Sequence, residues 1–450
     1  MECFPQLSFD GPRTLELSPL DAAFAHAIYD AVLRRWYTLE YIVRGLLQGD
    51  YDAMEPPLKA ALLAGAAQLL LLDRVPQHAA VNETVSWTKW AMNQGAGGLV
   101  NAVLRKVIEE VLGGQPRRIL PTWDGDPGAL PLADGTALFC GRMTLPEDPL
   151  ERLAVATSHP RTLLGRWRRD LGEAEAARIA LHDLISPPTI LNLGGVAPET
   201  VGCVAHDAPG HGVFGGTREE LNKILLENPR VWAQDPASSG AIESAAHLSP
   251  TLIIDVCAGQ GTKTRQLARA FPKARVIASD TDRTRLARLR EAAAHEPRIT
   301  VMDPVTVGKL HTGTADLVLL DVPCTNTGVL ARRVEARYRF DGDQMGRMVE
   351  TQREIFANAM RLLKPGGAML YATCSLEPEE NRLLVEAACE SGQFEVERVR
   401  QEPPRGQPGG RVEGYFDGAF SALLVQVPPG SKGKRSKRGT GASPVKRGRN

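Results

Sequence analysis

From residue 250 to about residue 390, short apolar runs alternate with helical segments, and this alternation limits the possible folds more than any other feature. The apolar runs are 252–256, 275–279, 299–301, 317–320 and 369–371. The segments with helical periodicity are 283–294, 345–363 and 377–391. Strands that alternate with helices form a parallel sheet with helices on both faces. The sequence therefore predicts a doubly wound, Rossmann-like α/β domain whose ligands bind beyond the carboxyl ends of the strands.

The first 110 residues or so have the pattern of a small all-helical domain. Ser18 can cap a helix that begins at Pro19, and Asp21 can bond back to the cap. Apolar residues then follow at spacings near 3.6. Further helical stretches are 57–72, 80–91 and 97–111.

The middle of the chain is less regular. Residues 112–148 are rich in Pro, Gly and Asp, which predicts a loop or linker. Residues 148–171 are helical in pattern, and 187–216 suggest a few short strands. We therefore expect a multidomain chain. Its parts are a helical domain at 1–140, a small mixed connector at 141–235, the α/β domain at 236–428 and a basic, disordered tail at 429–450.

Composition agrees with several cores and with a soluble protein. With 450 residues, of which 43% are hydrophobic and 24% charged, the chain has enough apolar material for two or three cores. The longest apolar stretch, 58–72, is too short to span a bilayer, and no signal peptide precedes the first helix, so we expect a cytoplasmic protein. The seven cysteines include no Cys-x-x-Cys pair, which argues against a disulfide framework and a metal cluster.

Charge is uneven along the chain, although the net charge is zero. The last segment carries Lys432, Lys434, Arg435, Lys437, Arg438, Lys446, Arg447 and Arg449, without an acid. Such a tail can contact a nucleic-acid backbone. A solubilising tail without a specific partner fits the same composition equally well.

The first strand of the α/β domain leads into a small-residue turn that opens a helix. The turn consists of Cys257, Ala258, Gly259, Gln260, Gly261, Thr262 and Lys263. Its glycines let backbone amides approach a ligand closely. The second strand ends at Asp280, where an acid can hold a ribose diol, and the third reaches Asp303. A turn with two such acids fits a nucleoside cofactor that lacks a pyrophosphate, which favours S-adenosylmethionine (SAM) over NAD.

Two cysteines follow the next two strands. The fourth strand ends at Asp321, shortly before Cys324, and the fifth ends just before Cys374. A single buried cysteine is more often an inert small hydrophobe than a reactive thiol, but two at adjacent strand ends beside an acid favour chemistry.

A pair of thiols beside an acid suits methylation of a pyrimidine. A thiolate that adds to carbon 6 of cytosine makes carbon 5 nucleophilic enough to accept a methyl group. A carboxyl group near N3, the position expected for Asp321, stabilises the charge that builds up on the ring. The hydrogen on carbon 5 must then leave, which gives a second thiol or another base a role.

Four motifs resemble those of the RNA cytosine-5 methyltransferases. They are Pro323-Cys324-Thr325-Asn326-Thr327-Gly328, Lys364-Pro365-Gly366-Gly367, Thr373-Cys374-Ser375 and Glu379-Glu380-Asn381. The resemblance implies that Cys374 is the nucleophile and that Cys324 assists product release. It also implies cofactor contacts from the turn 257–263 and from Asp280, Asp303 and Asp321. The turn departs from the family's usual form at Gly259, Gln260 and Thr262.

The amino-terminal half resembles the NusB family of helical RNA-binding domains. The matching segments are Gly65-Ala66-Ala67-Gln68-Leu69, Asp73-Arg74-Val75-Pro76, Val81-Asn82-Glu83 and Val100-Asn101-Ala102-Val103-Leu104-Arg105. Ser158-His159-Pro160-Arg161 and Arg166-Trp167 resemble the connector that joins such a domain to this methyltransferase. Together the segments resemble the bacterial 16S ribosomal RNA (cytosine-5) methyltransferases of the RsmB/Sun/Fmu type. This implies RNA, and 16S rRNA first, as the partner, rather than DNA or a membrane.

Two rival functions stay open from sequence alone. The same chemistry could act on transfer RNA or on another ribosomal site, or a NusB-like RNA-binding scaffold could carry an inactive methyltransferase domain.

Several polar side chains have two readings. Residues His159, Trp167 and Asn101 can all be structural, with Trp167 in a core and Asn101 as a helix cap. Arg332, Arg333, Arg337 and Tyr338 could contact the phosphates beside a flipped base, or could form a solvated face.

Overall fold

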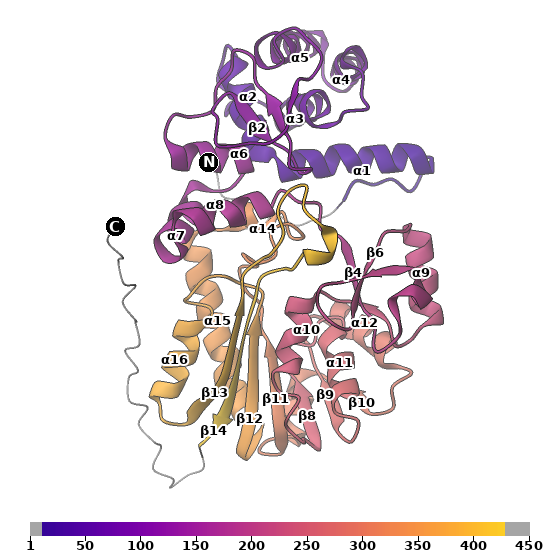
Figure 1. Cartoon of the computed structure of the whole chain (residues 1–450), viewed down its shortest axis with the longest axis vertical. Helices are drawn as coiled ribbons and strands as arrows, with labels where there is room; N and C mark the ends of the chain where they lie inside the picture. The colour runs from indigo at the N-terminus through magenta and orange to yellow at the C-terminus, as the bar shows by residue number, and fades with distance from the viewer. Residues whose placement is uncertain (1–10, 428–450) are drawn as a thin grey trace, which may run out of the picture.

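The computed structural model describes residues 11–427, which form three regions (Figure 1). A helical region lies at one end, an α/β region at the other, and the connector between and beside them. The basic tail expected at 429–450 falls outside the described residues. Among residues 11–427, the structure contains no helix with the length and apolar character that crossing a bilayer requires.

The amino-terminal region is helical, as the sequence predicts. Its helices are α1 (Pro19–Arg34), α2 (Trp36–Leu46), α3 (Pro56–Leu71), α4 (Gln77–Ala91), α5 (Gln94–Lys106) and the π-helix η1 (Val107–Val111). Ser18 caps α1 by accepting from the amide of Asp21, which confirms the predicted start. Helix α3 is buried along most of its length. Gly65 lets α5 approach it, because a Cβ there would lie 2.6 Å from Leu104 Cδ1.

Most of residues 112–148 lie in loops, as the sequence predicts, but three short strands lie among them. They form an antiparallel sheet, in the order β1-β3-β2, from β1 (Ile119–Leu120), β2 (Ala129–Pro131) and β3 (Ala137–Phe139). Leu130 and Leu138 pack into the core of the helical region. Strands of two or three residues are too short to show an alternating pattern, which explains why these three were not predicted.

The connector begins with α6 (Pro149–Thr157), α7 (Arg161–Leu171) and α8 (Glu173–His182). The helical stretch expected at 148–171 is broken because Ser158 adopts a left-handed conformation with φ of 58°. A four-stranded sheet follows, in the order β5-β6-β4-β7. Its strands are β4 (Thr189–Asn192), β5 (Cys203–Ala205), β6 (His211–Phe214) and β7 (Trp232–Ala233), with η2 (Pro198–Val201) and α9 (Arg218–Glu227) between them.

The third region is a seven-stranded sheet in the order β10-β9-β8-β11-β12-β14-β13. The strands are β8 (Leu252–Asp255), β9 (Arg275–Ala278), β10 (Ile299–Val301), β11 (Ala315–Asp321), β12 (Leu363–Thr373), β13 (Phe394–Glu402) and β14 (Ala419–Gln426). Strands β10, β9, β8, β11 and β12 pair in parallel with their neighbours, whereas β14 and β13 form an antiparallel edge. All five predicted strands are present, and the antiparallel edge is additional.

Helices cover both faces of this sheet, which confirms the doubly wound class. The helices are α10 (Pro236–Glu243), α11 (Thr262–Ala270), α12 (Arg283–Ala293), α13 (Pro304–Leu310), α14 (Ala336–Arg339), α15 (Gly342–Met360) and α16 (Arg382–Glu390), and η3 is Val412–Gly414. Helices α10, α11 and α12 share one apolar core with the sheet. Helices α13, α15 and α16 share the core on the opposite face.

The segment that follows β11 is held against the helical region. Leu33 and Tyr37, from α1 and α2, form a buried cluster with Val334 and Tyr338. The Tyr338 hydroxyl donates to the carbonyl of Leu33 at 2.5 Å. Figure 1 shows α14 at this junction, between the connector helices and the sheet. The helical region and the strand-end loops therefore share a core.

Tyr338→Phe should lower the free energy of unfolding by about 1–3 kcal/mol, because it leaves the buried carbonyl of Leu33 without its donor. Urea denaturation measures the change. Tyr41→Phe is the matched control, since the Tyr41 hydroxyl makes an exposed hydrogen bond to Thr144, and its effect should stay within about 0.5 kcal/mol. Equal effects of the two substitutions would show that the Tyr338 hydroxyl does not stabilise the junction.

Candidate active site at the strand ends

The two strand-end cysteines lie in contact. Strands β11 and β12 pair in parallel with Asp321 opposite Ala372, so the residues that follow both strands emerge at one edge. The Sγ atoms of Cys324 and Cys374 are 3.2 Å apart. Cys324 is buried and Cys374 is partly exposed. The hydrogen bond to Cys374, together with burial, raises the pKa of the Cys324 thiol well above its usual value. Of the two sulfurs, that of Cys374 is the more accessible to a ligand.

Asn326 connects the two cysteine loops. It has a positive φ of 62°, which is uncommon for a residue other than glycine. Its side-chain amide donates to the carbonyl of Cys324 at 2.8 Å, and its Oδ1 accepts from Cys374 Sγ at 3.3 Å. The strained backbone therefore positions one side chain to contact both loops.

Two glycines allow three segments to meet behind the cysteines. The amide of Gly328 donates to the carbonyl of Cys374 at 2.9 Å, and that of Gly418 donates to the carbonyl of Gly328 at 2.7 Å. A Cβ on Gly328 would lie 2.8 Å from the carbonyl oxygen of Gly418, closer than real contacts allow. Only glycine fits at this crossing without moving the backbone of one of the loops.

Asp321 forms an ion pair with Lys263 from the turn after β8. The Nζ atom of Lys263 lies 2.8 Å from Asp321 Oδ2. Burial acts to lower the pKa of Lys263, but the charge of Asp321 and its hydrogen bond outweigh burial and raise it. The amine therefore keeps its proton, and a positive charge links the turn to the end of β11.

The turn 257–263 is open on one side and anchored on the other. The amide of Gly259 donates to Asp280 Oδ2 at 2.9 Å, which fixes the turn against the end of β9. A Cβ on Gly259 would meet no atom of residues 11–427 within 4 Å. Helix α11 begins at Thr262, and within those residues no side chain caps it. Its first amides are thus available to a ligand.

Asp303 makes its hydrogen bonds within its own helix rather than to the turn 257–263. Its side chain caps α13 by accepting from the amide of Thr306 at 3.0 Å and from the Thr306 hydroxyl at 2.6 Å. The residue is exposed. A cofactor contact from Asp303 stays a prediction.

The prediction that Arg337 and Tyr338 contact phosphates is wrong. Arg337 and Tyr338 are fully buried. The Arg337 guanidinium donates to the carbonyls of Thr157, Asp183 and Leu330. Arginine is usually exposed, but three backbone acceptors replace water here.

The other two arginines of that prediction differ from each other. Arg332 pairs with Asp417 at 2.7 Å and with Asp235 at 3.4 Å. Arg333 keeps 63% of its side chain exposed. Only Arg333 is thus still available for the expected contact with a phosphate.

His159 and Trp167 have structural roles, which was one of the two interpretations that the sequence allowed. His159 is buried, with Nε2 lying 3.0 Å from Asp183 Oδ2, and the Trp167 indole donates to Glu377 Oε1 at 3.1 Å. The expected capping role of Asn101 is wrong. It lies inside α5, where it accepts from Arg105, and Asn93 is the cap.

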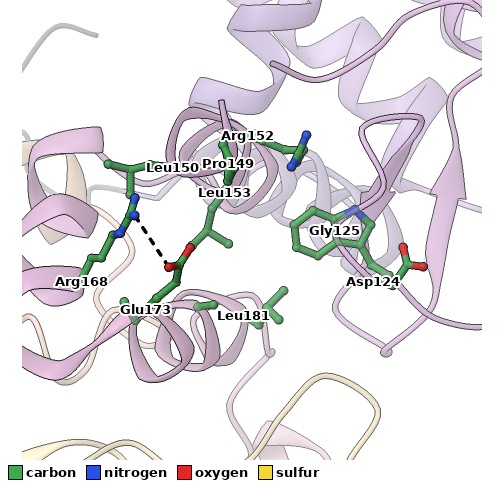
Figure 2. A pocket seen from close by; sticks show the side chains of 12 residues that line it. Asp124, Gly125, Pro149, Leu150, Arg152, Leu153, Arg168, Glu173 and Leu181 are labelled. Atoms are coloured by element: carbon green, nitrogen blue, oxygen red, sulfur yellow. Dashed lines mark ion pairs between the residues drawn. The ribbon is translucent and has the colours of Figure 1, made fainter. Parts of the chain in front are cut away.

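A separate pocket of about 360 Å³ opens in the connector (Figure 2). Helices α6, α7 and α8 and the loop 123–125 line it, and an ion pair between Arg168 and Glu173 closes one side at 3.7 Å. Neither of the strand-end cysteines, nor any part of the turn 257–263, belongs to its lining. Because the two thiols and the glycine-containing turn lie elsewhere, the pocket is not the candidate active site.

Comparison with known proteins gives the family. The family model described as 16S rRNA methyltransferase RsmB/F matches residues 246–413, and the NusB family model matches residues 6–109. A relative from Sodalis glossinidius, named ribosomal RNA small subunit methyltransferase B, is 30% identical over 396 residues, which is 82% of each chain. The chain belongs to the RsmB/F family of 16S rRNA methyltransferases. This confirms the resemblance seen in the sequence.

Other similarities agree with the RsmB/F assignment. A Vibrio cholerae protein, also named ribosomal RNA small subunit methyltransferase B, is 29% identical over 422 residues, covering 91% of this chain and 90% of the relative. A solved chain described as PH0851 superposes with a TM-score of 0.69 at 20% identity and covers 91% of both chains. At that identity the superposition supports the fold alone.

Asp255, at the end of β8, makes the free energy of unfolding depend on pH. Burial raises the pKa of Asp255 from 3.8 to about 7, although the Thr264 hydroxyl, which donates at 2.7 Å, acts against this. The folded protein therefore binds this proton more readily than the unfolded chain does. The stability that this group contributes falls as pH rises from about 4 to about 7.

Asp255→Asn cannot ionise but keeps an acceptor for Thr264. Its free energy of unfolding should therefore increase relative to the wild type as pH rises through that window. Urea denaturation at a series of pH values measures the difference. A difference that does not change with pH would contradict the raised pKa.

Proposed function

We propose that this RsmB/F protein transfers a methyl group from SAM to carbon 5 of a cytosine in RNA, with 16S rRNA as the first candidate. The observation that carries the proposal is the contact between two thiols, with Sγ atoms 3.2 Å apart, at neighbouring strand ends. The Asp321–Lys263 ion pair at the end of β11 supplies the acid that the reaction needs. Relatives named ribosomal RNA small subunit methyltransferase B support ribosomal RNA as the substrate class.

The residues of the turn 257–263 fit SAM as the cofactor. SAM, when bound, supplies an electrophilic methyl group. The open side of Gly259 leaves room for a ligand, and the free amides of α11 suit its carboxylate. Asp280 already accepts from two backbone amides and keeps further lone pairs for a ribose diol.

The chemistry starts at Cys374 in this proposal. Its thiolate adds to carbon 6 of cytosine, and the displaced electron pair moves toward N3, which takes a proton from the Asp321–Lys263 pair. Carbon 5 would then take the methyl group that bound SAM supplies, as the bond between that group and the SAM sulfur breaks. Addition of the thiolate is necessary because carbon 5 of free cytosine is a poor nucleophile.

Release needs a second group. A base removes the hydrogen from carbon 5, the double bond between carbons 5 and 6 forms again, Cys374 leaves as a thiolate, and N3 returns its proton to the Asp321–Lys263 pair. Cys324 lies next to the sulfur that carries the adduct. We assign Cys324 to this release step.

Bisulfite sequencing of total RNA from cells with and without the gene tests the substrate. One cytosine of 16S rRNA should lose protection in the deletion strain. A lost site in transfer RNA or in another ribosomal RNA would move the same chemistry to that substrate. No lost site, together with no SAM binding by calorimetry, would favour a scaffold without activity.

Asp280→Ala should weaken SAM binding by about 1.5–3 kcal/mol, because it removes a charged acceptor. Isothermal titration calorimetry measures the affinity. Asp282→Ala is the control, since that acid caps α12 through Thr284 and Arg285 and has no bond to the turn. The ribose assignment fails if Asp280→Ala binds SAM with wild-type affinity.

The two cysteine variants should behave differently. Cys374→Ala should abolish both methylation and the covalent RNA complex, because carbon 5 is never activated. Cys324→Ala should still attack and methylate but release slowly, so that an RNA–protein adduct accumulates on a denaturing gel. The opposite pattern, with an adduct only in Cys374→Ala, would make Cys324 the nucleophile.

A further inference from the structure

One buried carboxylate lies beneath both cysteine loops. Cys324 is followed by Thr325 and Cys374 by Ser375, and both hydroxyls donate to the same oxygen, Oε2 of Glu380. The amide of Thr325 donates to the other oxygen, Oε1, at 2.9 Å. Glu380 thus bonds to the residue after each cysteine, although the cysteines are 50 residues apart in the sequence. Glu380 has no role in the sequence-based predictions beyond its place in a motif.

Glu380 is fully buried and its acceptor positions are filled. Besides the three bonds from Thr325 and Ser375, Oε1 accepts from Gln352 Nε2 at 2.9 Å. An ionised carboxylate has about four acceptor sites, so these four donors use them all. Burial raises the pKa of Glu380, while the hydroxyl, amide and Gln352 donors act to lower it. The position therefore suits a carboxylate that binds neighbours rather than one that reacts.

Gln352, which binds Glu380, also fixes the backbone just before Cys324. Gln352 Nε2 donates to the carbonyl of Pro323 at 2.9 Å as well as to Glu380. The carbonyl of Glu380 accepts from the hydroxyl of Tyr371 on β12 at 2.7 Å. The Pro323–Thr325 stretch is therefore held on both sides of Cys324.

The neighbouring acids have a different task. Glu377 and Glu379 both pair with Arg166 of α7, at 2.9 Å and 2.8 Å. Their carboxylates link the strand-end loop to the connector and make no bond to Thr325 or to Ser375 among the described residues, although the backbone amide of Glu377 donates to Ser375 Oγ at 3.0 Å. Glu379 is therefore a matched control for Glu380, one position away with the same side chain.

We propose that Glu380 is a positioning residue that holds the thiols of Cys324 and Cys374 in contact by anchoring Thr325 and Ser375. It makes no hydrogen bond to either sulfur and positions them through the two loops, while its charge adds to the causes that raise the pKa of the Cys324 thiol. The inference rests on the proposed function for its catalytic meaning, because release requires the second thiol beside the adduct. A displacement of about 1 Å in such a group can cost on the order of 100-fold in rate.

A cross-linking experiment measures the thiol contact without RNA or SAM. Diamide takes two electrons and two protons from a pair of thiols, which leaves a disulfide and the reduced hydrazine. Mass spectrometry of peptides from the full-length protein follows the bond between Cys324 and Cys374 and separates it from the other cysteines. The wild type and Glu379→Ala should form it at equal rates. Glu380→Ala should form it at least about tenfold more slowly, following the loss of positioning.

Variants with smaller changes keep the test valid if Glu380→Ala does not fold, which thermal unfolding reports. Thr325→Val and Ser375→Ala each remove one of the two hydroxyl bonds to Glu380, and each should slow the cross-link. Glu380→Gln keeps one oxygen for the Thr325 amide and offers a donor that the hydroxyls can accept. It should restore a rate close to that of the wild type.

Kinetics then connect position to catalysis. In Glu380→Ala we expect kcat to fall by about tenfold or more, with the KM for RNA and the SAM affinity unchanged. A wild-type cross-linking rate in Glu380→Ala, or in both Thr325→Val and Ser375→Ala, would overturn the proposal. If Glu380→Ala slows the cross-link but the wild type methylates no RNA, the positioning role stands and the proposed function fails.

Discussion

The site depends on the parallel pairing of β11 with β12. Their register, from Leu317 opposite Ala368 to Asp321 opposite Ala372, makes both strands end at one edge of the sheet. This shared direction brings the candidate catalytic side chains together, because the residues that follow parallel strands emerge at the same edge of the sheet. Strand β8 joins β11 on its other side, so α11 brings Lys263 to Asp321 as well. A shift in this register would separate the two sulfurs.

The sequence predicted what depends on local patterns. Strand β8 is a continuous apolar run, and α1 begins at its predicted cap, so both were found. Strand β13 was missed because most of its residues are exposed and show no apolar pattern. The cysteines were found because each follows a strand. The position of Glu380 was not, because it arises where three segments distant in sequence meet. The prediction that Arg337 contacts a phosphate was wrong for a related reason, since the carbonyls that bind its guanidinium come from three separate segments.

Hydrogen bonds between buried polar groups define the junction of the three regions. Tyr338 reaches the carbonyl of Leu33, and its hydroxyl lies 3.1 Å from Ser158 Oγ of the connector. Asp183, whose pKa burial raises to about 8, lies beside His159 and near Arg337. Apolar contacts alone would permit several relative orientations. Directional bonds select one, because a buried donor left unpaired is costly.

The cover that Leu33 and Tyr37 place over Tyr338 limits how such proteins can exchange parts. A different amino-terminal module joined at the connector would leave Val334 and Tyr338 facing water, next to the loop that carries Cys324. The amino-terminal helices therefore cannot be treated as an interchangeable adaptor. Any replacement module would have to supply its own carbonyl and its own apolar cap at that point, so the two halves are expected to be inherited together.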